Sequence, residues 1–300
     1  MDILRFKPIL KTVVWGGEKI APYKGIETQQ THIGESWELS GVKGNESVID
    51  GGDLDGKTIA DVFPGEFPLL IKFIDAAGDL SIQVHPNDAL AAVRHNGSKG
   101  KTEMWYVVDA EPGAYLYAGL KEEIGPEEYS RRVADGSIVD VLARHDVHKG
   151  DVFFLPAGRI HAICKGCFIA EIQETSDITY RIWDYNRPGL DGKPRQLHTE
   201  LAKDAIDYKV YPDYRTEYTP KKDEEVVLVS CEHFTTSLYE LTKPFTRNVP
   251  GEFLVVMCID GSGKVDDVPV RRGQTVLVPA SRKTVTFTPA DGMKLITSWV

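Results

Sequence analysis

The hydrophobic and polar positions of this chain follow mainly the pattern of β-strands. Short runs rich in β-branched and aromatic residues are separated by Gly, Pro and Asn, the residues that favour turns. In the first two thirds these runs are FPLLIKFIDA (67–76), LSIQVHP (80–86), EMWYVVDA (103–110), DVFFLP (151–156), FIAEIQET (168–175) and ITYRIWDY (178–185). Further along, VVLVS, FTTSLYEL, FLVVMCI, QTVLVPA and TVTFTP continue the pattern. The sequence therefore predicts an all-β fold.

Helical periodicity is confined to a few short segments. They are TIADVF near residue 60, NDALAAVRHNG after the QVHP run, PEEYSRRVADGSIVDVLARH at 126–145, and TELAKDAI at 199–206. These segments do not alternate with the strands as they would in a βαβ fold. We expect small helical insertions in a β protein, the main one at about 122–148.

A change of composition late in the chain indicates a boundary between two parts. The stretch YPDYRTEYTPKKDEE (211–225) is charged and punctuated by proline, and the sequence beyond it is patterned as strand alone. We therefore predict a domain carrying the chemistry at 1–220 and a smaller β domain at 221–300.

The two predicted domains share one short motif. Gly150 and Pro156 in GDVFFLP have the same spacing as Gly273 and Pro279 in GQTVLVP, but only the first copy is followed by a histidine. Two related β-barrel lobes, the second degenerate, are the simplest account of this repeat.

Composition narrows the class of protein. The chain has 300 residues, of which 42% are hydrophobic, and no apolar run approaches the roughly 20 residues that span a bilayer. Its net charge is −10, with no cluster of Lys and Arg interleaved with aromatic residues. We therefore expect a cytoplasmic protein with neither nucleic acid nor membrane as partner. The pattern carries no information on oligomeric state.

The pair of cysteines in CKGC has the spacing of half a zinc site. Cys231 and Cys258 are too far apart in the chain to supply the other half. Lys165 and Gly166 between the pair instead predict a two-residue hairpin turn, with Cys164 and Cys167 opposite each other on paired strands. We interpret these cysteines as structural.

A separate group of residues predicts a metal site. Gln83 and His85 lie two apart on a strand, so their side chains leave the same face. Glu103 begins the next strand, and His161 follows a turn in which Gly158 gives the backbone extra freedom. Two imidazoles, a carboxylate and an amide oxygen suit a divalent transition metal, with Zn²⁺ the leading candidate. Taken singly, Gln83 or His161 is more simply explained as a hydrogen-bonded structural residue.

The other histidines lack such a setting, and we expect them to be surface or structural residues: His32, His95, His145, His148, His198 and His233.

These motifs resemble those of known families. The G-x5-P-x-G-x2-H spacing at 150–161 resembles the second cupin motif, and QVH with the later Glu103 resembles the first, with Gln in place of one His. More specifically, the first two thirds resemble the type I phosphomannose isomerases of the short bacterial form. The segments that carry the likeness are WGGEKI (15–20), IGESWELS (33–40), LLIKFIDA (69–76), SIQVHPND (81–88), GKTEMWYV (100–107), PAGRIHAI (156–163) and EIQETSDITYRIWDYNR (171–187).

The resemblance implies a bicupin that interconverts mannose 6-phosphate and fructose 6-phosphate through an enediol. It implies one Zn²⁺ per chain, with ligands at Gln83, His85, Glu103 and His161, and a catalytic role for Arg181. Arginine stays protonated and suits an electrostatic clamp on the oxygen that becomes negative. The alternative for Arg181 is a structural ion pair with Asp184 or Glu174.

Other charged residues near these motifs are candidates for substrate binding and proton transfer. Lys72 and Lys101 could hold the phosphate or a sugar hydroxyl, and the alternative is that both are solvated surface lysines. The candidates for the base that moves the proton are three carboxylates and a water molecule at the metal. The carboxylates are Asp177, Glu171 and Glu174. Trp15 and Trp37 are candidates for a pocket wall, and the alternative is that both pack in the core.

Two other functions fit the wider cupin class. One is an iron oxygenase, in which two histidines and one carboxylate hold the metal. The other is a non-catalytic sugar-binding protein. The fourth ligand at Gln83 and the nearby cations favour the isomerase, because an oxygenase has no need to hold a phosphate.

Overall fold

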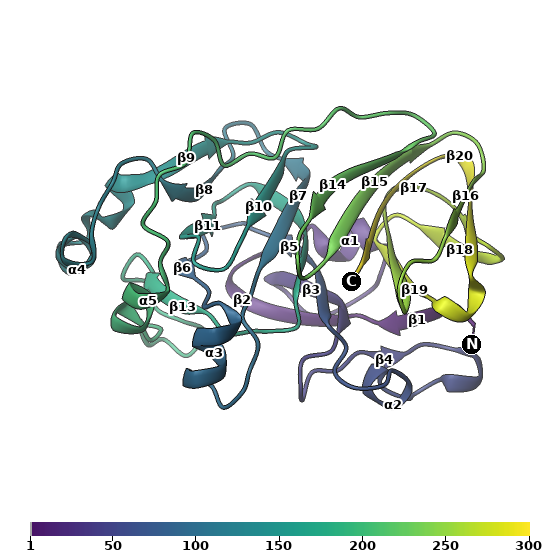
Figure 1. The fold of residues 1–300 in the computed structure, drawn as a ribbon, viewed down its shortest axis with the longest axis horizontal. Coiled ribbons are helices and arrows are strands. Elements are labelled where there is room, and N and C mark those ends of the chain that lie inside the picture. The colour runs from purple at the N-terminus through teal and green to yellow at the C-terminus, as the bar shows by residue number, and fades with distance from the viewer. Residues whose placement is uncertain (1) are drawn as a thin grey trace.

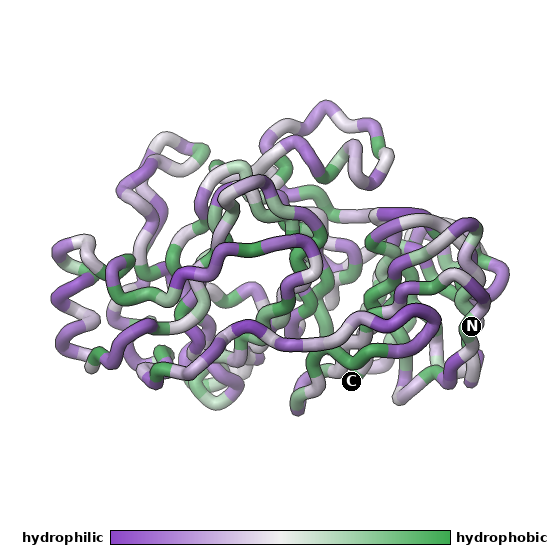
Figure 2. Tube along the Cα trace, turned by 90° about the horizontal axis from the view of Figure 1, so that it is seen from above, coloured by the Kyte–Doolittle hydropathy of each residue, from purple (hydrophilic) through white to green (hydrophobic). Residues whose placement is uncertain are grey.

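The protein is built mostly of β-strands, grouped in three sheets (Figure 1). The computed structural model describes residues 2–300. Apolar segments gather inside the molecule, and hydrophilic segments run along the outer loops (Figure 2). The prediction of an all-β fold with small helical insertions is confirmed.

Two of the sheets face each other and form a barrel-like lobe. The six-stranded sheet has the order β10 (Val152–Leu155), β7 (Glu103–Ala110), β12 (Cys167–Glu174), β5 (Leu69–Asp75), β3 (Ile33–Ser40) and β2 (Ile9–Gly17). The five-stranded sheet has the order β13 (Tyr180–Trp183), β6 (Ile82–Val84), β11 (His161–Ile163), β8 (Tyr115–Leu120) and β9 (Leu142–Asp146). A core that includes Trp105 and Ile169 from the first sheet and Leu116 and Ile163 from the second joins them.

The third sheet combines both ends of the chain. Its order is β14 (Glu225–Ser230), β15 (Thr235–Leu241), β20 (Thr284–Trp299), β17 (Phe253–Val265), β19 (Gln274–Pro279), β1 (Leu4–Lys7) and β4 (Val48–Ile49), with β16 (Phe245–Asn248) on β20 and β18 (Val268–Arg271) on β17. Leu4 pairs with Leu277, so the N-terminus lies beside the C-terminal strands (Figure 1). The boundary near residue 220 stays a prediction.

The helices are short and lie around the sheets. They are α1 (Ile20–Lys24), α2 (Ile59–Val62), α3 (Asp88–Arg94), α4 (Pro126–Asp135) and α5 (Thr199–Ala205), with 3-10 turns η1 (Gly52–Leu54), η2 (Ser137–Val141) and η3 (Ala280–Arg282). Within residues 2–300, no helix combines the length and apolar content that crossing a bilayer requires.

The helix predicted at 126–145 ends early. Gly136 adopts a left-handed backbone conformation with φ of 79°, which stops α4 after Asp135. The rest of the segment forms η2 and then strand β9, so the prediction was wrong beyond Asp135. The apolar residues there, Ile138 and Val141, are buried against the five-stranded sheet by a turn instead of a helix.

The central six-stranded sheet is buried on both faces, which explains the continuous apolar run of β5. Leu69, Ile71 and Phe73 face a core shared with the nine-stranded sheet. Because side chains alternate along a strand, Lys72 leaves the opposite face, into the barrel-like lobe. The same alternation places Glu103 and Glu171 on the barrel side of β7 and β12.

Replacing Ile71 by alanine should destabilise the protein by about 2–5 kcal/mol, the usual cost of truncating a large buried aliphatic side chain. Ile71 has no exposed surface and joins the two lobes through their shared core. Denaturant unfolding measures the change. Val93→Ala on α3, where the side chain is 84% exposed, is the control and should change stability by no more than about 0.5 kcal/mol. Equal effects of the two substitutions would contradict this core.

The CKGC segment differs from its prediction. Cys164 and Cys167 do not face each other on paired strands, because β11 and β12 belong to different sheets. The turn at Lys165 and Gly166 passes the chain from the five-stranded to the six-stranded sheet, and Gly166 N donates to Ala76 O. Both cysteines are free and buried, which agrees with a structural role.

The repeated Gly–Pro motif has the same local geometry in both copies. Gly150 and Gly273 both have positive φ, at 96° and 81°, and each precedes an antiparallel strand, β10 or β19. This likeness supports a relation between the lobes, while the bicupin organisation itself stays a prediction.

Candidate active site

Strand pairing brings three of the predicted residues into one row. His161 on β11 lies opposite Gln83 on β6, and Gln83 lies opposite Arg181 on β13. Directly opposed residues of an antiparallel pair leave the same face of the sheet. The intervening apolar residues, such as Ile82 and Val84, pack against the helices on the other face. The row therefore points into the barrel-like lobe.

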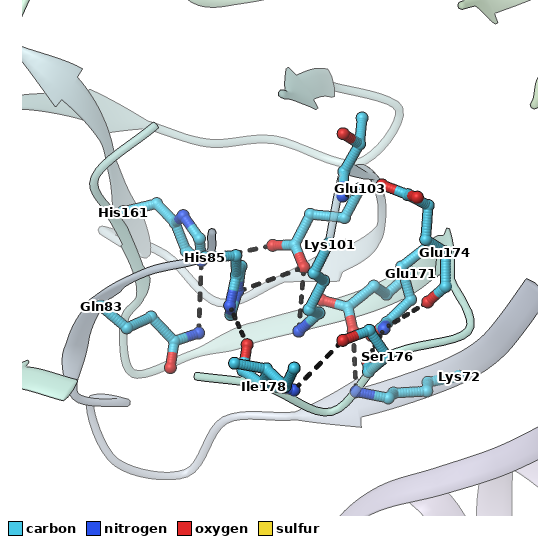
Figure 3. A network of polar contacts seen from close by, with 12 residues as sticks. Lys72, Gln83, His85, Lys101, Glu103, His161, Glu171, Glu174, Ser176 and Ile178 are labelled. Atoms are coloured by element: carbon cyan, nitrogen blue, oxygen red, sulfur yellow. Dashed lines mark hydrogen bonds and ion pairs between the residues drawn. The ribbon is translucent and has the colours of Figure 1, made fainter. Parts of the chain in front are cut away.

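The predicted metal ligands converge at the end of this row (Figure 3). His85 Nε2 lies 3.5 Å from Glu103 Oε2, and His161 Nε2 lies 3.3 Å from Glu103 Oε1. The Gln83 amide is 3.2 Å from His161 Nε2. Ligand atoms at the corners of a tetrahedron around zinc, with bonds of about 2.0–2.1 Å, would be separated by roughly 3.3 Å.

Hydrogen bonds fix the orientation of both imidazoles. Nδ1 of His85 lies 2.9 Å from the carbonyl oxygen of Ile178, and Nδ1 of His161 lies 2.8 Å from that of Arg159. A carbonyl only accepts, so each Nδ1 carries the proton and donates it. The Nε2 lone pair of His85 is then directed toward Glu103 without a hydrogen-bond partner in residues 2–300. The Nε2 lone pair of His161 faces both Glu103 and the amide nitrogen of Gln83.

The cluster offers several buried lone pairs to a cation. Burial lowers the pKa of both imidazoles, to about 4 for His161, so both are neutral near neutral pH. His85 Nε2 and both oxygens of Glu103 are buried without a hydrogen-bond partner in the described chain. Burial also raises the pKa of Glu103, and the charge of Glu171 adds to this effect. Lone pairs that face one another in this way fit a divalent metal ion. The Gln83 amide can turn its oxygen toward the same point.

Both predicted lysines lie beside the predicted metal ligands and are buried, not solvated. Lys101 Nζ is 3.1 Å from Glu103 Oε2, since Lys101 and Glu103 point the same way on the extended chain. Lys72 Nζ is 3.0 Å from Glu171 Oε1 and 3.8 Å from Glu35 Oε2. Burial opposes the charge of Lys72, but the two carboxylates outweigh it and raise its pKa.

The carboxylates considered as bases separate into two groups. Glu171 and Asp177 line a cavity of about 250 Å³ next to the predicted metal ligands. Glu171 is ionised, because the charges of Lys72 and Lys101 outweigh burial and lower its pKa. Glu174 faces the other lobe, where it pairs with His233 at 3.0 Å and accepts from the backbone N of Thr102.

The cavity also contains residues that the sequence analysis only partly identified. Trp15 and Trp37 line it, as predicted for a pocket wall, and so does Arg181, for which a catalytic role was expected. Glu35 and Arg195 were missed. Glu35 was visible as the acidic residue of IGESWELS that alternates with Trp37, but Arg195 lies in a loop with no recognisable pattern.

Arg181 is not the ion-paired residue of the alternative interpretation. Its Nη1 donates to the backbone oxygen of Gln196 at 2.8 Å, and its Nε is buried without a partner in residues 2–300. Asp184 instead binds Arg187 and Arg195.

Comparison with known proteins agrees with this geometry. Residues 3–115 match the family model of the phosphomannose isomerase type I catalytic domain. The chain is 32% identical over 293 residues to the mannose-6-phosphate isomerase ManA of Bacillus subtilis, covering 92% of each chain. It is 34% identical over 278 residues to the probable mannose-6-phosphate isomerase GmuF of the same organism, covering 87% of each. The crystal structure of the Bacillus subtilis mannose 6-phosphate isomerase superposes with a TM-score of 0.91 at 29% identity over the whole of both chains.

The fold and these relatives place the protein among enzymes of the isomerase class with a cupin-type fold. The chain belongs to the type I phosphomannose isomerase family.

Proposed function

We propose that this protein interconverts mannose 6-phosphate and fructose 6-phosphate at a divalent metal held by Gln83, His85, Glu103 and His161. The observation that carries the proposal is the convergence of two neutral imidazoles and a carboxylate beside a cavity lined by cations. Of their atoms, His85 Nε2 and both oxygens of Glu103 have no hydrogen-bond partner in residues 2–300. The similarity over more than nine tenths of the chain to a mannose-6-phosphate isomerase supports the choice of substrate.

The metal in this proposal is Zn²⁺, one per chain. Two imidazole nitrogens, a carboxylate and an amide oxygen suit it, as they suit other first-row metals. When bound, zinc acts as a Lewis acid that stabilises negative charge on a sugar oxygen.

The protein's own residues orient the sugar and balance its charge. The isomerisation moves a proton from C2 to C1 through an enediol, while a second proton passes from the oxygen on C2 to the oxygen on C1. Negative charge develops on these two oxygens during the reaction. Arg181, one strand away from Gln83, donates N–H groups toward the cavity and stabilises that charge. Lys101 and Lys72 hold sugar hydroxyls at the same end, where each is fixed by a carboxylate.

Glu171 and Asp177 are the two side chains proposed for proton transfer. Both line the cavity. Glu171 is ionised, but because the charges of Lys72 and Lys101 lower its pKa it accepts a proton only as a weak base. Its Oε2 accepts from Trp105 Nε1 at 2.8 Å, which fixes its position.

Removal of the metal should abolish activity reversibly. The purified protein should convert mannose 6-phosphate to fructose 6-phosphate, lose this activity after treatment with a chelator, and regain it when Zn²⁺ is added. A coupled assay of fructose 6-phosphate measures the turnover, and unfolding temperatures measured alongside show whether the chelated protein is still folded. Full activity in protein shown to be free of metal would refute the metal-dependent mechanism, and failure of the folded, zinc-loaded protein to turn over would refute the substrate assignment.

A further inference from the structure

Three arginines gather around one buried carboxylate beside β13, at the edge of the five-stranded sheet. Asp184 is 4% exposed. Its Oδ1 accepts from Arg187 Nη2 at 2.8 Å and from Arg195 Nη2 at 2.6 Å, and its Oδ2 accepts from Arg195 Nε at 2.7 Å. Arg181 lies next to this group, because its Nη1 binds the backbone oxygen of Gln196.

Arg195 is held in place along one edge and borders the cavity. Its Nε and Nη2 are both used by Asp184, while its Nη1 has no hydrogen-bond partner in residues 2–300. The loop that carries it is closed by a bridge between Pro188 and Pro194 and by the hydrogen bond from Gly189 N to Lys193 O at 2.7 Å. A guanidinium fixed in this way presents its remaining N–H groups in a set direction, which suits an oxyanion.

The charges along the cavity differ between its two ends. At the metal end, Lys101 and Lys72 are each matched by a carboxylate at 3.1 and 3.0 Å. At the β13 end, the guanidinium groups outnumber Asp184, and the charges of Arg195 and Arg187 act with burial to lower the pKa of Arg181. An excess of positive charge with unused donors attracts a dianion.

We propose that Arg195, positioned by Asp184, binds the phosphate of the sugar phosphate and thereby selects phosphorylated sugars over free ones. The inference rests on the proposed function, since it assigns one end of the same substrate. The reacting carbons lie at the metal ligands and Arg181, and the phosphate lies beyond Arg181 at Arg195. Lys72 and Lys101 are left to the hydroxyl groups of the sugar.

Replacing Arg195 by methionine tests this assignment. Loss of a charged hydrogen bond to phosphate should raise KM for mannose 6-phosphate roughly 10- to 100-fold and leave kcat within about threefold. The inhibition constant of inorganic phosphate should rise by a similar factor. Arg195→Lys should recover part of the loss through its charge, and Asp184→Asn should raise KM because Arg195 loses its support. Arg131→Met, an exposed arginine on α4, is the control.

The outcomes separate this inference from the proposed function. If the wild-type enzyme turns over mannose 6-phosphate but Arg195→Met keeps its KM and its inhibition by phosphate, the phosphate lies elsewhere and the inference is wrong. A rise of KM in Arg187→Met with none in Arg195→Met would also overturn it, as would a loss confined to kcat. If the wild type shows no turnover, calorimetric titration with inorganic phosphate still tests the role of Arg195. Weaker phosphate binding by Arg195→Met than by the wild type supports a phosphate site at Arg195, and equal binding excludes it.

Discussion

His161→Ala is expected to lower kcat about a thousandfold or more and to remove the bound metal. The substitution takes away an Nε2 lone pair that its hydrogen bond to the Arg159 carbonyl directs at Glu103. It leaves a buried carboxylate with fewer partners, so the remaining ligands hold a cation more weakly. Losing a Lewis acid removes several kcal/mol of transition-state stabilisation. Turnover and metal content by mass spectrometry measure the two effects.

A loss of folding must be separated from a loss of metal in this variant, because His161 is buried. Zn²⁺ should raise the unfolding temperature of the wild type but leave that of His161→Ala almost unchanged, since a ligand stabilises only the folded state that binds it. His148→Ala, an exposed histidine on the same lobe, should behave as the wild type. Full zinc occupancy in folded His161→Ala would remove this residue from the ligand set.

Arg181→Ala is expected to lower kcat by about a hundred- to a thousandfold while metal content stays at the wild-type level. These are the usual losses when one fixed donor to a developing negative charge is removed. Arg181 lies opposite the proposed metal ligand Gln83 on the neighbouring strand, and it is not itself a member of the proposed ligand set. Steady-state kinetics measure the loss of kcat, and metal analysis of the same preparation shows whether the metal content is unchanged.

Two further variants make the Arg181 result specific. Arg181→Lys keeps the charge but loses the planar pair of donors, so it should recover only a small part of the rate. Arg144→Ala, an exposed arginine on β9, is the control for the loss of one positive charge. Near-normal kcat in Arg181→Ala, or loss of metal in parallel with activity, would rule out the clamp role.

Much of this site could be expected from the sequence because strand alternation is a strict rule. The two-residue spacing of Gln83 and His85 sets their common face, and the Lys101–Glu103 spacing does the same at the start of β7. Lys72 stands out as a charge within the apolar run of β5, so its burial in the barrel follows from the same alternation.

Features that depend on the folded arrangement of distant segments, or on the backbone conformation of a single residue, could not be predicted from strand alternation. The CKGC turn has the local chemistry of a hairpin, yet it joins strands of two different sheets. Helical periodicity at 126–145 continued past Gly136, although the left-handed glycine ends the helix there. Arg195 lies in an irregular loop. It reaches the cavity because it binds Asp184, a contact that only the folded structure reveals.

The pairing of β1 with β19 has a consequence for how the protein is made. On the ribosome, Leu4 of β1 emerges long before Leu277 of its partner strand β19. Until β19 has been made, the edge of β1 that pairs with it stays unsatisfied. Closing contacts between the two ends of a chain also slows folding, because the entropy of a long loop must be lost first. A nascent or truncated chain lacking the last strands is therefore the form of this protein most exposed to aggregation and to capture by chaperones.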